Sequence, residues 1–465
     1  MARTQEHGPR VAVLGLGREG TALARYLARK GYQVTVSDLG TEAELAPSLM
    51  ALRGLEIEYA LGGHPNSLLE ADALYVSPGV PFDAPILEAA RGRGVPLETE
   101  TRLFFRLCPA PIVGITGSSG KTTTALLAGA MLQETGARTW VGGNIGDPLI
   151  ERVDEIAAED AVVLELSSFQ LQGLEASPHI ACVLNIHPDH LDRHPTMADY
   201  IEAKWNILKH QGPEDLAVLN RDDPLTFDWT GGPRRVLAFS RRYPVEEGAE
   251  LKDGTIWLRL PSGDASICRT EEFRLRGEHN LSNLLAAVAV AASAGAEPQA
   301  IARAARAFRG APHRLESLGE AEGVLFVNDS IATSPSRAVS ALRSLDRPIV
   351  LLAGGRSKDL PLEDLALHIV ERVRHLILFG ESAGKLRAAV NDAMRLWGGE
   401  GLSISEAADL EEAVRLAVAD ARPGEAVLLA PGHTSFDAYR NFEERGAHFR
   451  SLVAQMAGVG EGSGL

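Results

Sequence analysis

The centre of the chain contains the stretch that decides its fold, Pro111-Ile112-Val113-Gly114-Ile115 followed by Thr116-Gly117-Ser118-Ser119-Gly120-Lys121-Thr122. The apolar run at its start predicts a buried strand, and the composition of residues 123–135 predicts a helix after it. The glycines let the backbone curl so that several N–H groups converge on one anion, and the helix dipole adds positive potential there. Lys121 can reach the outer phosphates of a nucleotide, and the Thr122 hydroxyl can ligate Mg²⁺. The stretch therefore predicts a phosphate-binding strand–loop–helix unit.

This loop is a variant of the common phosphate-binding pattern G-x-x-x-x-G-K-[ST]. Ile115 stands where that pattern has its first glycine, so the loop is shorter and is counted from Gly117. The alternative is a tight turn with an exposed lysine and no ligand. The position of the loop, directly between a predicted strand and a predicted helix, favours the phosphate site.

A second glycine motif lies near the start of the chain. Residues 10–14 form an apolar run, Gly15-Leu16-Gly17-Arg18-Glu19-Gly20 follows, residues 21–29 have helical composition, and residues 32–37 predict a strand that Asp38 closes. The order predicts a βαβ unit, and the glycine spacing fits the dinucleotide fingerprint, with Asp38 near the distance of a ribose contact. The alternatives are an NAD-dependent dehydrogenase and a glycine turn without a ligand. Because a dehydrogenase does not need a second phosphate loop, we interpret the motif as another kind of phosphate or nucleotide site.

Polar residues follow two further predicted strands of the central segment. Glu165 ends an apolar strand, and Asp189 and His190 follow the apolar run of residues 180–186. The carboxyl ends of parallel strands meet at one edge of an open sheet, where ligands bind. Carboxylates at this edge could hold a hard cation beside the phosphates, so the pattern favours a metal site. Lys204, by contrast, has the local pattern of a solvated surface lysine.

The chain after Ala311-Pro312 repeats the α/β pattern. Apolar runs predict parallel strands at residues 324–327, 348–353, 376–379 and 426–429. Arg314 could stabilise the charge of a transferring phosphoryl group or form a surface ion pair, and the sequence leaves both open. Lys358 and Ser435 follow glycine turns and could bind an anionic substrate, with the same alternative.

Length and charge narrow the class of protein. A chain of 465 residues predicts about three domains. The net charge of -16, from 46 basic and 62 acidic residues, disfavours nonspecific nucleic-acid binding. Neither a transmembrane run nor a signal peptide is predicted. The three cysteines, at positions 108, 182 and 268, are far apart, which predicts free buried thiols in a reducing compartment rather than a zinc site.

Taken together, these motifs resemble the Mur ligase superfamily, the ATP-dependent amino-acid ligases of peptidoglycan synthesis. The resemblance is carried by Thr116–Thr122, Gly143-Asn144-Ile145-Gly146, Glu165-Leu166-Ser167-Ser168-Phe169-Gln170-Leu171, Asn185, Asp189-His190-Leu191-Asp192-Arg193-His194, Gly277, His279-Asn280, Asn283 and His313-Arg314. The chain is most similar to the members that add D-glutamate to UDP-N-acetylmuramoyl-L-alanine. That similarity rests on Gly15-Leu16-Gly17, Ser77-Pro78-Gly79, Asn328-Asp329-Ser330, Ala332-Thr333, Ser435-Phe436-Asp437 and Asn441-Phe442-Glu443-Glu444-Arg445-Gly446.

The resemblance implies an α/β fold of three domains. These are a Rossmann-like UDP-sugar domain at residues 1–101, a P-loop-type ATPase domain at 102–311 and a Rossmann-like amino-acid domain at 312–465. The substrate carboxylate would attack the γ-phosphate to give an acyl phosphate, and the amine of D-glutamate would then displace phosphate. The resemblance also implies ATP, two Mg²⁺ ions and a carbamylated Lys204. It implies a cytoplasmic bacterial monomer that acts on small molecules, without nucleic-acid binding or membrane insertion.

The same resemblance assigns expected roles residue by residue. The catalytic set is Lys121, His190, Lys204 and Arg314. The ATP set is Gly117, Ser118, Ser119, Gly120, Lys121, Thr122, Thr123, Asn144, Asn280, Asn283, Arg314 and Asp329. The UDP-substrate set is Gly15, Leu16, Gly17, Asp38, Ser77, Pro78, Gly79, Asn144, Ser167, Gln170 and His190. The D-glutamate set is Thr333, Lys358, Ser435 and Phe442. The metal set is Thr122, Glu165, His190 and Lys204 as its carbamate.

Several positions depart from the family pattern. Ser119 stands where asparagine is common, Ile331 replaces a frequent lysine, Arg356 takes an often acidic place, and Gly432-His433 replaces a common Ala-Cys pair. The remaining alternatives are another Mur ligase, a folylpolyglutamate synthase, the dehydrogenase, and a noncatalytic nucleotide-binding protein. A ligase for a diamino acid is disfavoured because the chain lacks the Asp-Asn-Pro-Arg segment of such enzymes.

Overall fold

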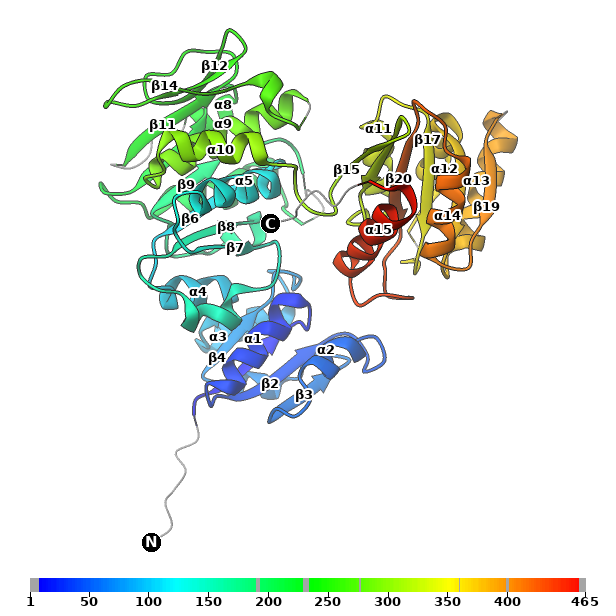
Figure 1. The fold of residues 1–465 in the computed structure, drawn as a ribbon. Coiled ribbons are helices and arrows are strands. Elements are labelled where there is room, and N and C mark those ends of the chain that lie inside the picture. The colour runs from blue at the N-terminus through cyan, green and yellow to red at the C-terminus, as the bar shows by residue number, and fades with distance from the viewer. Residues whose placement is uncertain are drawn as a thin grey trace. The chain divides into compact units, whose positions relative to one another are not determined.

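The computed structural model describes residues 8–189, 193–228, 234–275, 277–358, 360–398 and 401–459. The chain divides into two compact units, Met1–Phe308 and Arg309–Leu465. The first unit contains two sheets and the second contains one (Figure 1). Helices pack on all three sheets, which places the protein in the α/β class.

The N-terminal sheet has five parallel strands in the order β3-β2-β1-β4-β5. The strands are β1 (Arg10–Leu14), β2 (Gln33–Asp38), β3 (Ile57–Leu61), β4 (Ala73–Val76) and β5 (Leu97–Glu98). The helices are α1 (Arg18–Arg29), α2 (Ala46–Ala51), η1 (Asn66–Glu70), α3 (Pro85–Arg93) and α4 (Glu100–Leu107). The strand order reverses between β1 and β4, so the loops after these strands meet at the switch point where open sheets bind ligands.

The central sheet has nine strands in the order β14-β13-β12-β11-β10-β9-β6-β8-β7, with antiparallel pairing only at β12-β13-β14 among the described pairs. The strands are β6 (Ile112–Thr116), β7 (Thr139–Gly143), β8 (Ala161–Glu165), β9 (Ile180–Val183), β10 (Leu216–Asn220), β11 (Arg235–Ser240), β12 (Gly248–Lys252), β13 (Thr255–Arg259) and β14 (Ala265–Arg269). The helices are α5 (Lys121–Gln133), η2 (Leu149–Glu155), α6 (Ser168–Leu171), α7 (Met197–Lys209), α8 (Pro224–Phe227), η3 (Thr270–Glu272), α9 (Glu278–Ser293) and α10 (Pro298–Ala307). Because β6 lies between β8 and β9, the loops after these three strands converge.

The sheet of the second unit has six strands in the order β15-β16-β20-β17-β18-β19, and β15 is antiparallel to β16. The strands are β15 (Glu316–Ala321), β16 (Val324–Asn328), β17 (Ile349–Gly354), β18 (Val373–Phe379), β19 (Ser403–Glu406) and β20 (Ala426–Gly432). The helices are α11 (Pro335–Arg343), α12 (Glu363–Arg372), α13 (Ala383–Trp397), α14 (Leu410–Asp420) and α15 (Phe442–Ala457). Because β20 pairs in parallel with both β16 and β17, the loops after these three strands leave the same edge of the sheet.

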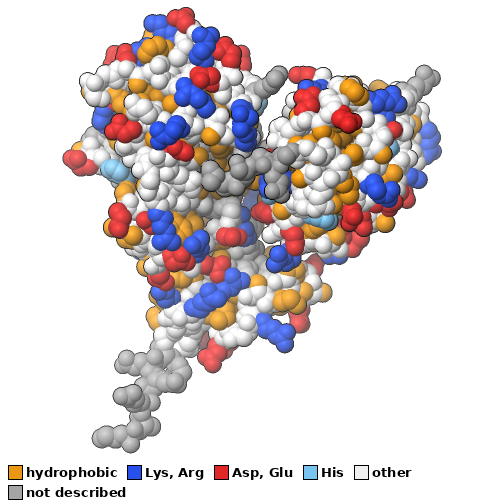
Figure 2. Space-filling model, viewed as in Figure 1, with side chains coloured by type: hydrophobic (Ala, Val, Ile, Leu, Met, Phe, Trp, Pro, Cys, Tyr) orange, Lys and Arg blue, Asp and Glu red, His pale blue; other side chains and the backbone are white. Residues whose placement is uncertain are grey.

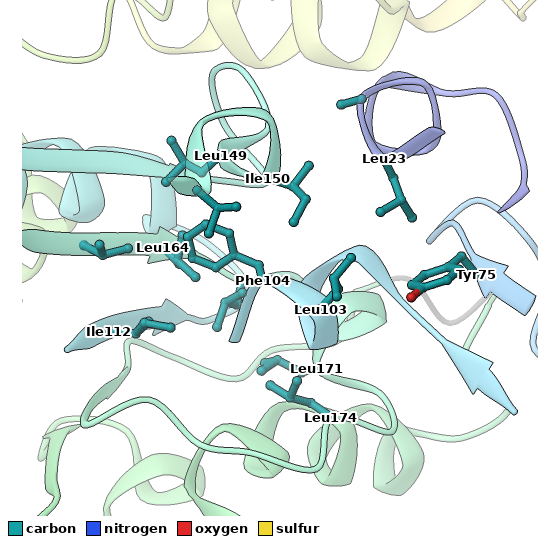
Figure 3. Packing of buried hydrophobic residues seen from close by; sticks show 14 of the residues in the cluster. Leu23, Tyr75, Leu103, Phe104, Ile112, Leu149, Ile150, Leu164, Leu171 and Leu174 are labelled. Atoms are coloured by element: carbon teal, nitrogen blue, oxygen red, sulfur yellow. The ribbon is translucent and has the colours of Figure 1, made fainter. Parts of the chain in front are cut away.

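A shared hydrophobic cluster holds the two sheets of the first unit together (Figure 3). Leu23 of α1 and Tyr75 of β4 come from the N-terminal part, and Ile150 of η2 and Leu171 of α6 come from the central part. Phe104 of α4 lies in the same cluster and is almost fully buried. Burying such side chains contributes roughly 1.5–3 kcal/mol each. Loops of both sheets can therefore build one site with a fixed geometry.

The predicted strand at residues 10–14 and the predicted strand that Glu165 ends are confirmed, as are the helices after both glycine loops. The strand predicted over residues 180–186 ends earlier, at Val183. The residues after Val183 contact the phosphate loop, since the Ser118 N–H donates to the Asn185 carbonyl at 2.9 Å. Helix α7 and strand β7 were not predicted from the sequence.

The visible surface of the described residues carries acidic and basic side chains side by side (Figure 2). No helix among the described residues has the length and apolar character needed to cross a membrane. The three cysteines are free, as predicted; Cys182 and Cys268 are buried, and Cys108 is partly exposed.

Candidate active site

The phosphate loop connects β6 to α5, and neighbouring segments hold its shape. The Ser119 N–H donates to the Asn185 side-chain oxygen at 2.9 Å, and the Ser118 hydroxyl lies 2.8 Å from the Tyr200 hydroxyl. Gly120 has a φ of +84°, and a Cβ there would lie 2.2 Å from the side-chain oxygen of Asn283. Both this left-handed conformation and this close contact favour glycine. The loop is therefore preorganised as a ring of backbone donors at the start of a helix.

Lys121 is the first residue of α5. Its ammonium donates to the Gly117 carbonyl at 2.9 Å and to the Ser118 carbonyl at 3.3 Å, so the charge stays beside the loop. Thr123 follows in the first turn of the same helix. The positive charge and the helix N-terminus together make this end of α5 suited to a phosphate chain.

Glu165 is the buried carboxylate of the site. One of its oxygens accepts a hydrogen bond from the Thr122 hydroxyl at 2.7 Å, and the other accepts from the Asn144 side chain at 3.1 Å. The Asn144 N–H also donates to the Glu165 carbonyl at 2.9 Å. A buried carboxylate and a hydroxyl, both hard oxygen donors, suit a divalent cation beside phosphates. The residues present thus fit Mg²⁺ chemically.

The local expectation that Lys204 is a solvated surface lysine is wrong. The residue is only 2% exposed, and its ammonium donates to the Gly117 carbonyl at 2.8 Å. The ammonium also lies 4.6 Å from the centre of the Tyr200 ring. Burial, with Lys121 nearby, lowers the pKa of Lys204 to about 7, although Asp189 and Glu165 act in the opposite direction. Helix α7 turns this lysine inward against the phosphate loop, which its local sequence does not reveal.

Two asparagines, Asn280 and Asn283, lie near the start of α9. The Asn283 side chain donates to the Asn280 side-chain oxygen at 3.3 Å, and Asn283 is packed against Gly120. Asn283 thus lies against the phosphate loop, and Asn280 is hydrogen-bonded to Asn283.

The N-terminal glycine motif opens into a cavity of ≈ 870 Å³. Predicted residues that line it are Gly15, Gly17, Asp38, Ser77, Pro78 and Gly79. Asp38 holds the glycine turn, because its carboxylate accepts from the Leu16 N–H at 2.6 Å and from the Gly40 N–H at 2.8 Å. Ser77 closes the turn from β4 by donating to the Gly15 carbonyl at 3.0 Å. The cavity is large enough for a sugar nucleotide.

Polar contacts connect this cavity to the central part of the unit. The Gln170 side chain donates to Glu19 at 2.9 Å, and the Ser167 N–H donates to the Gln170 side-chain oxygen at 3.0 Å. The Arg18 guanidinium donates to the Gly146 carbonyl at 2.7 Å. Burial raises the pKa of Glu19 to about 7, against the opposing charge of Arg18. Within the first unit, the glycine motif that lines the cavity is therefore connected by hydrogen bonds to loops of the central part.

In the second unit, Asp329 follows β16 and is buried. It accepts a hydrogen bond from the Leu315 N–H at 2.9 Å, and burial raises its pKa to about 6. Arg314 is exposed, and its charge acts on Asp329 in the opposite direction. Arg314 is thus a surface residue near this carboxyl, and its role in phosphoryl transfer stays a prediction.

Three of the four residues expected to bind D-glutamate come from loops at the carboxyl edge of the sheet of the second unit, and the fourth begins a helix. Thr333 and Lys358 line the same small pocket. Ser435 is buried in the loop after β20, and Phe442 begins α15. The Ser330 hydroxyl donates to the Phe442 carbonyl at 2.8 Å, which ties the loop after β16 to α15.

Arg445 fixes these loops to one another from inside the unit. The side chain is 0% exposed, and its guanidinium donates to the Ser330 carbonyl at 2.9 Å and the Thr434 carbonyl at 3.2 Å. It also donates to the Ser330 hydroxyl at 3.0 Å and the His433 carbonyl at 3.3 Å. One buried cation thus organises the segments that carry Thr333, Ser435 and Phe442.

Replacing Arg445 with methionine is expected to lower the free energy of unfolding by about 3 kcal/mol, because several buried oxygens lose their donors. Urea denaturation measures the change. Arg440→Met is the matched control, since Arg440 is exposed and pairs with Glu444 at the surface. An Arg445→Met midpoint equal to that of the control would contradict this role.

His190 lies outside the described residues. Tyr200, which contacts the phosphate loop, was not predicted as a site residue. The same holds for three residues that line the N-terminal cavity, Arg18, Glu19 and His64. Arg18 and Glu19 occupy variable positions inside the glycine motif, so the motif itself could have indicated them. Tyr200 and His64 carry no comparable local signal.

Three family models match the chain in order. A Mur ligase MurD-like N-terminal domain matches residues 9–98, a Mur ligase middle domain matches 115–291, and a Mur ligase glutamate ligase domain matches 313–433. A UDP-N-acetylmuramoylalanine--D-glutamate ligase of Symbiobacterium thermophilum is 45% identical over 96% of this chain and 98% of its own length. The chain belongs to the Mur ligase family.

Further relatives and solved structures agree with this placement. A UDP-N-acetylmuramoylalanine--D-glutamate ligase of Acetivibrio thermocellus is 41% identical over 96% of both chains. The crystal structure of the UDP-N-acetylmuramate-alanine ligase of Thermotoga maritima has a TM-score of 0.57 at 18% identity, over 96% of this chain and 99% of that one. The latter shows that the three-domain fold is shared.

Family membership settles the class of reaction. Mur ligases use ATP and Mg²⁺, and this member is an ATP-dependent, ADP-forming ligase. The N-terminal glycine motif therefore belongs to a ligase, and the alternative of a dehydrogenase is wrong. The phosphate loop and the buried Glu165 form the part of the site that this chemistry requires.

Proposed function

We propose that this Mur ligase adds D-glutamate to UDP-N-acetylmuramoyl-L-alanine in peptidoglycan precursor synthesis. The observation that carries the proposal is the 45% identity, over nearly the full length of both chains, to a ligase named for D-glutamate. The sites support it, because the chain has a cavity for a sugar nucleotide and a phosphate loop. In the second unit, Thr333 and Lys358, which can donate hydrogen bonds to a carboxylate, line the same small pocket.

The reaction joins a carboxylate to an amine at the expense of ATP. The carboxylate of the UDP-linked substrate attacks the γ-phosphorus, the bond from that phosphorus to the β,γ-bridging oxygen breaks, and ADP leaves as the acyl phosphate forms. The amine of D-glutamate then attacks the acyl carbon, and inorganic phosphate leaves. Lys121 and the loop N–H groups would stabilise charge on the transferring phosphoryl group. Arg314 and Asp329, from the second unit, are proposed to contact ATP.

Mg²⁺ would neutralise the phosphate oxygens, and we assign two ions to the site. Thr122, Glu165 and His190 are the proposed ligands on the protein. The contact of Thr122 with Glu165 at 2.7 Å supports this assignment for two of the three.

We assign a carbamate to Lys204. Only a neutral amine adds to CO₂, in a reaction that forms an N–C bond and releases one proton. The pKa of about 7 caused mainly by burial leaves much of Lys204 neutral near pH 7, unlike an ordinary lysine. The product is an anion beside Lys121 and the cation site, where it could help to hold Mg²⁺.

The remaining features are proposed from family and composition. We divide the chain into a UDP-sugar domain at residues 1–101, an ATP domain at 102–311 and an amino-acid domain at 312–465. We propose a monomer in the bacterial cytoplasm that acts on small molecules.

The proposal predicts a strict amino-acid requirement. With ATP, Mg²⁺ and UDP-N-acetylmuramoyl-L-alanine present, D-glutamate is expected to release phosphate at least about 100-fold faster than L-glutamate, L-alanine or a diamino acid, because a site built for one set of polar groups rejects ligands that leave them unpaired. Phosphate release measures this directly, with omission of the UDP substrate as the control. Equal rates with another amino acid would reject the assignment.

A further inference from the structure

The side chain of Arg241 ties the loop after β11 to the start of helix α9. Its Nε donates to the Ser282 hydroxyl at 2.7 Å, and its Nη1 donates to the Glu278 carboxylate at 2.8 Å. Both acceptors belong to the first two turns of α9, and they lie four residues apart on one face of the helix. Only 17% of the Arg241 side chain is exposed, so the guanidinium is held between the loop and the helix.

The backbone of Arg241 is fixed in turn to the loop after β10. The Arg241 N–H donates to the Asp222 carboxylate at 2.8 Å, and the other Asp222 oxygen accepts from the Ser240 hydroxyl at 2.6 Å. The Asp222 N–H donates to the Asn220 side-chain oxygen at 2.9 Å. The Asn220 side chain is buried and donates to the Leu184 carbonyl at 2.7 Å. The guanidinium therefore extends toward α9 from a loop that is connected to the segment after β9.

These contacts form a ring around the phosphate loop. At one end, the Leu184 N–H donates at 2.9 Å to the carbonyl of Thr116, the last residue of β6. At the other end, the side-chain oxygen of Asn283 lies so close to Gly120 that a Cβ there would be 2.2 Å from it. The phosphate loop is thus supported at both of its ends, and the guanidinium completes the ring through α9.

The polar start of α9 needs this support more than the rest of the helix does. Leu284, Leu285 and Val288 are fully buried in the core of the central part, which fixes the body of the helix. The first turn follows Gly277, whose φ is +97°, and it has no comparable apolar contacts because its side chains are polar. Polar groups that face a ligand keep their geometry only when a second layer of hydrogen bonds holds them.

We propose that Arg241 is a positioning residue for ATP: it fixes the first two turns of α9, so that Asn283 stays against the phosphate loop in the arrangement that binds the nucleotide. The inference rests on the proposed function for the assignment of ATP to this loop. Arg241 acts through α9. The Glu278 side chain is 80% exposed, so we expect the bond to Ser282 to carry most of the effect.

Calorimetric titration with Mg²⁺ and a nonhydrolysable ATP analogue tests the proposal directly. Arg241→Met removes both donors, and its Kd for the analogue is expected to rise about 10-fold. Arg241→Lys keeps one donor and is expected to lose about 3-fold. Ser282→Ala removes the better buried acceptor, and its Kd should rise by at least about 3-fold. A wild-type Kd in Arg241→Met would overturn the proposal.

The double variant Arg241→Met with Ser282→Ala shows whether the two residues act through one bond. Residues that act through a shared contact have non-additive effects. We therefore expect the double variant to bind the analogue as Arg241→Met does. A Kd that rises by the product of the two single effects would mean that the two residues act independently, which contradicts the proposal.

A partial reaction separates positioning from a general loss of structure. Hydroxylamine traps the acyl phosphate as a hydroxamate, so the first chemical step can be followed without an amino acid. In Arg241→Met, KM for ATP is expected to rise as Kd does, while KM for UDP-N-acetylmuramoyl-L-alanine and kcat at saturation stay within about 2-fold. Equal increases in both KM values would show a general loosening and overturn the proposal.

Arg235→Met is the matched control. Arg235 belongs to β11, is exposed and pairs with Glu247 at the surface. The control is expected to keep the wild-type Kd for the analogue. An increase equal to that of Arg241→Met would contradict a specific role of Arg241.

Failure of the proposed function has a different signature, because the wild-type enzyme would then prefer another amino acid in the phosphate-release panel. The calorimetric titration contains neither an amino acid nor the UDP substrate. Its result therefore decides the role of Arg241 whichever amino acid the enzyme prefers.

Discussion

Replacing Lys121 with alanine is expected to lower kcat by about 10²–10³-fold or more, because a preorganised positive charge at the transferring phosphoryl group is lost. The ammonium lies 2.9 Å from the Gly117 carbonyl, so it belongs to the loop and acts without reorganising. The loop itself keeps its shape in the variant, since Ser118 and Ser119 are held by Asn185. The loss should therefore fall on phosphoryl transfer more than on folding.

Hydroxamate formation in the absence of D-glutamate measures this effect on the first chemical step. Lys209→Ala is the matched control, because Lys209 is an exposed lysine at the end of α7. The control is expected to retain wild-type rates, and both variants to keep the wild-type Tm within a few degrees. An Lys121→Ala enzyme with full ATP turnover would exclude the assigned role.

Local sequence was sufficient where the functional group and its support are close in the chain. The phosphate loop lies between a predicted strand and a predicted helix, and the structure has both, as β6 and α5. Glu165 was expected at a strand end, and its position beside Thr122 follows from the parallel pairing of β6 with β8. Strand ends in a parallel sheet converge whatever the intervening sequence.

Local sequence was insufficient where burial depends on distant segments. Lys204 is an ordinary lysine on an amphipathic helix until α7 packs against the phosphate loop and Gly117 becomes its partner. The pocket of the second unit is similar, because Thr333, Lys358 and His433 come from three loops. The sequence marked His433 only as a departure from the family pattern. Only the fold shows that the ring of His433 is buried and that its Nε2 atom has no hydrogen-bond partner among the described residues.

Replacing Lys204 with alanine is expected to lower kcat by about 10²-fold or more, since the carbamate would be lost as an anion beside the Mg²⁺ ions and the phosphates. Short carboxylic acids, added with bicarbonate as in the wild-type assay, should restore part of the activity by entering the space that the side chain leaves. The wild-type enzyme should show the matching pH dependence of carbamate formation. Because the folded pKa is about 7, the neutral amine is depleted below that pH and predominates above it.

The modification can be observed without turnover. In ¹³C-labelled bicarbonate, the wild-type enzyme is expected to show a carbamate carbon signal that grows from pH 6 to pH 8, and Lys204→Ala is expected to lack it. Lys209→Ala again serves as the control and should keep the signal, since it removes an exposed amine. Wild-type activity in Lys204→Ala, or a carbamate signal that survives in this variant, would reject the assignment. Loss of activity without rescue and without a wild-type signal would instead leave Lys204 acting as an ammonium donor to Gly117.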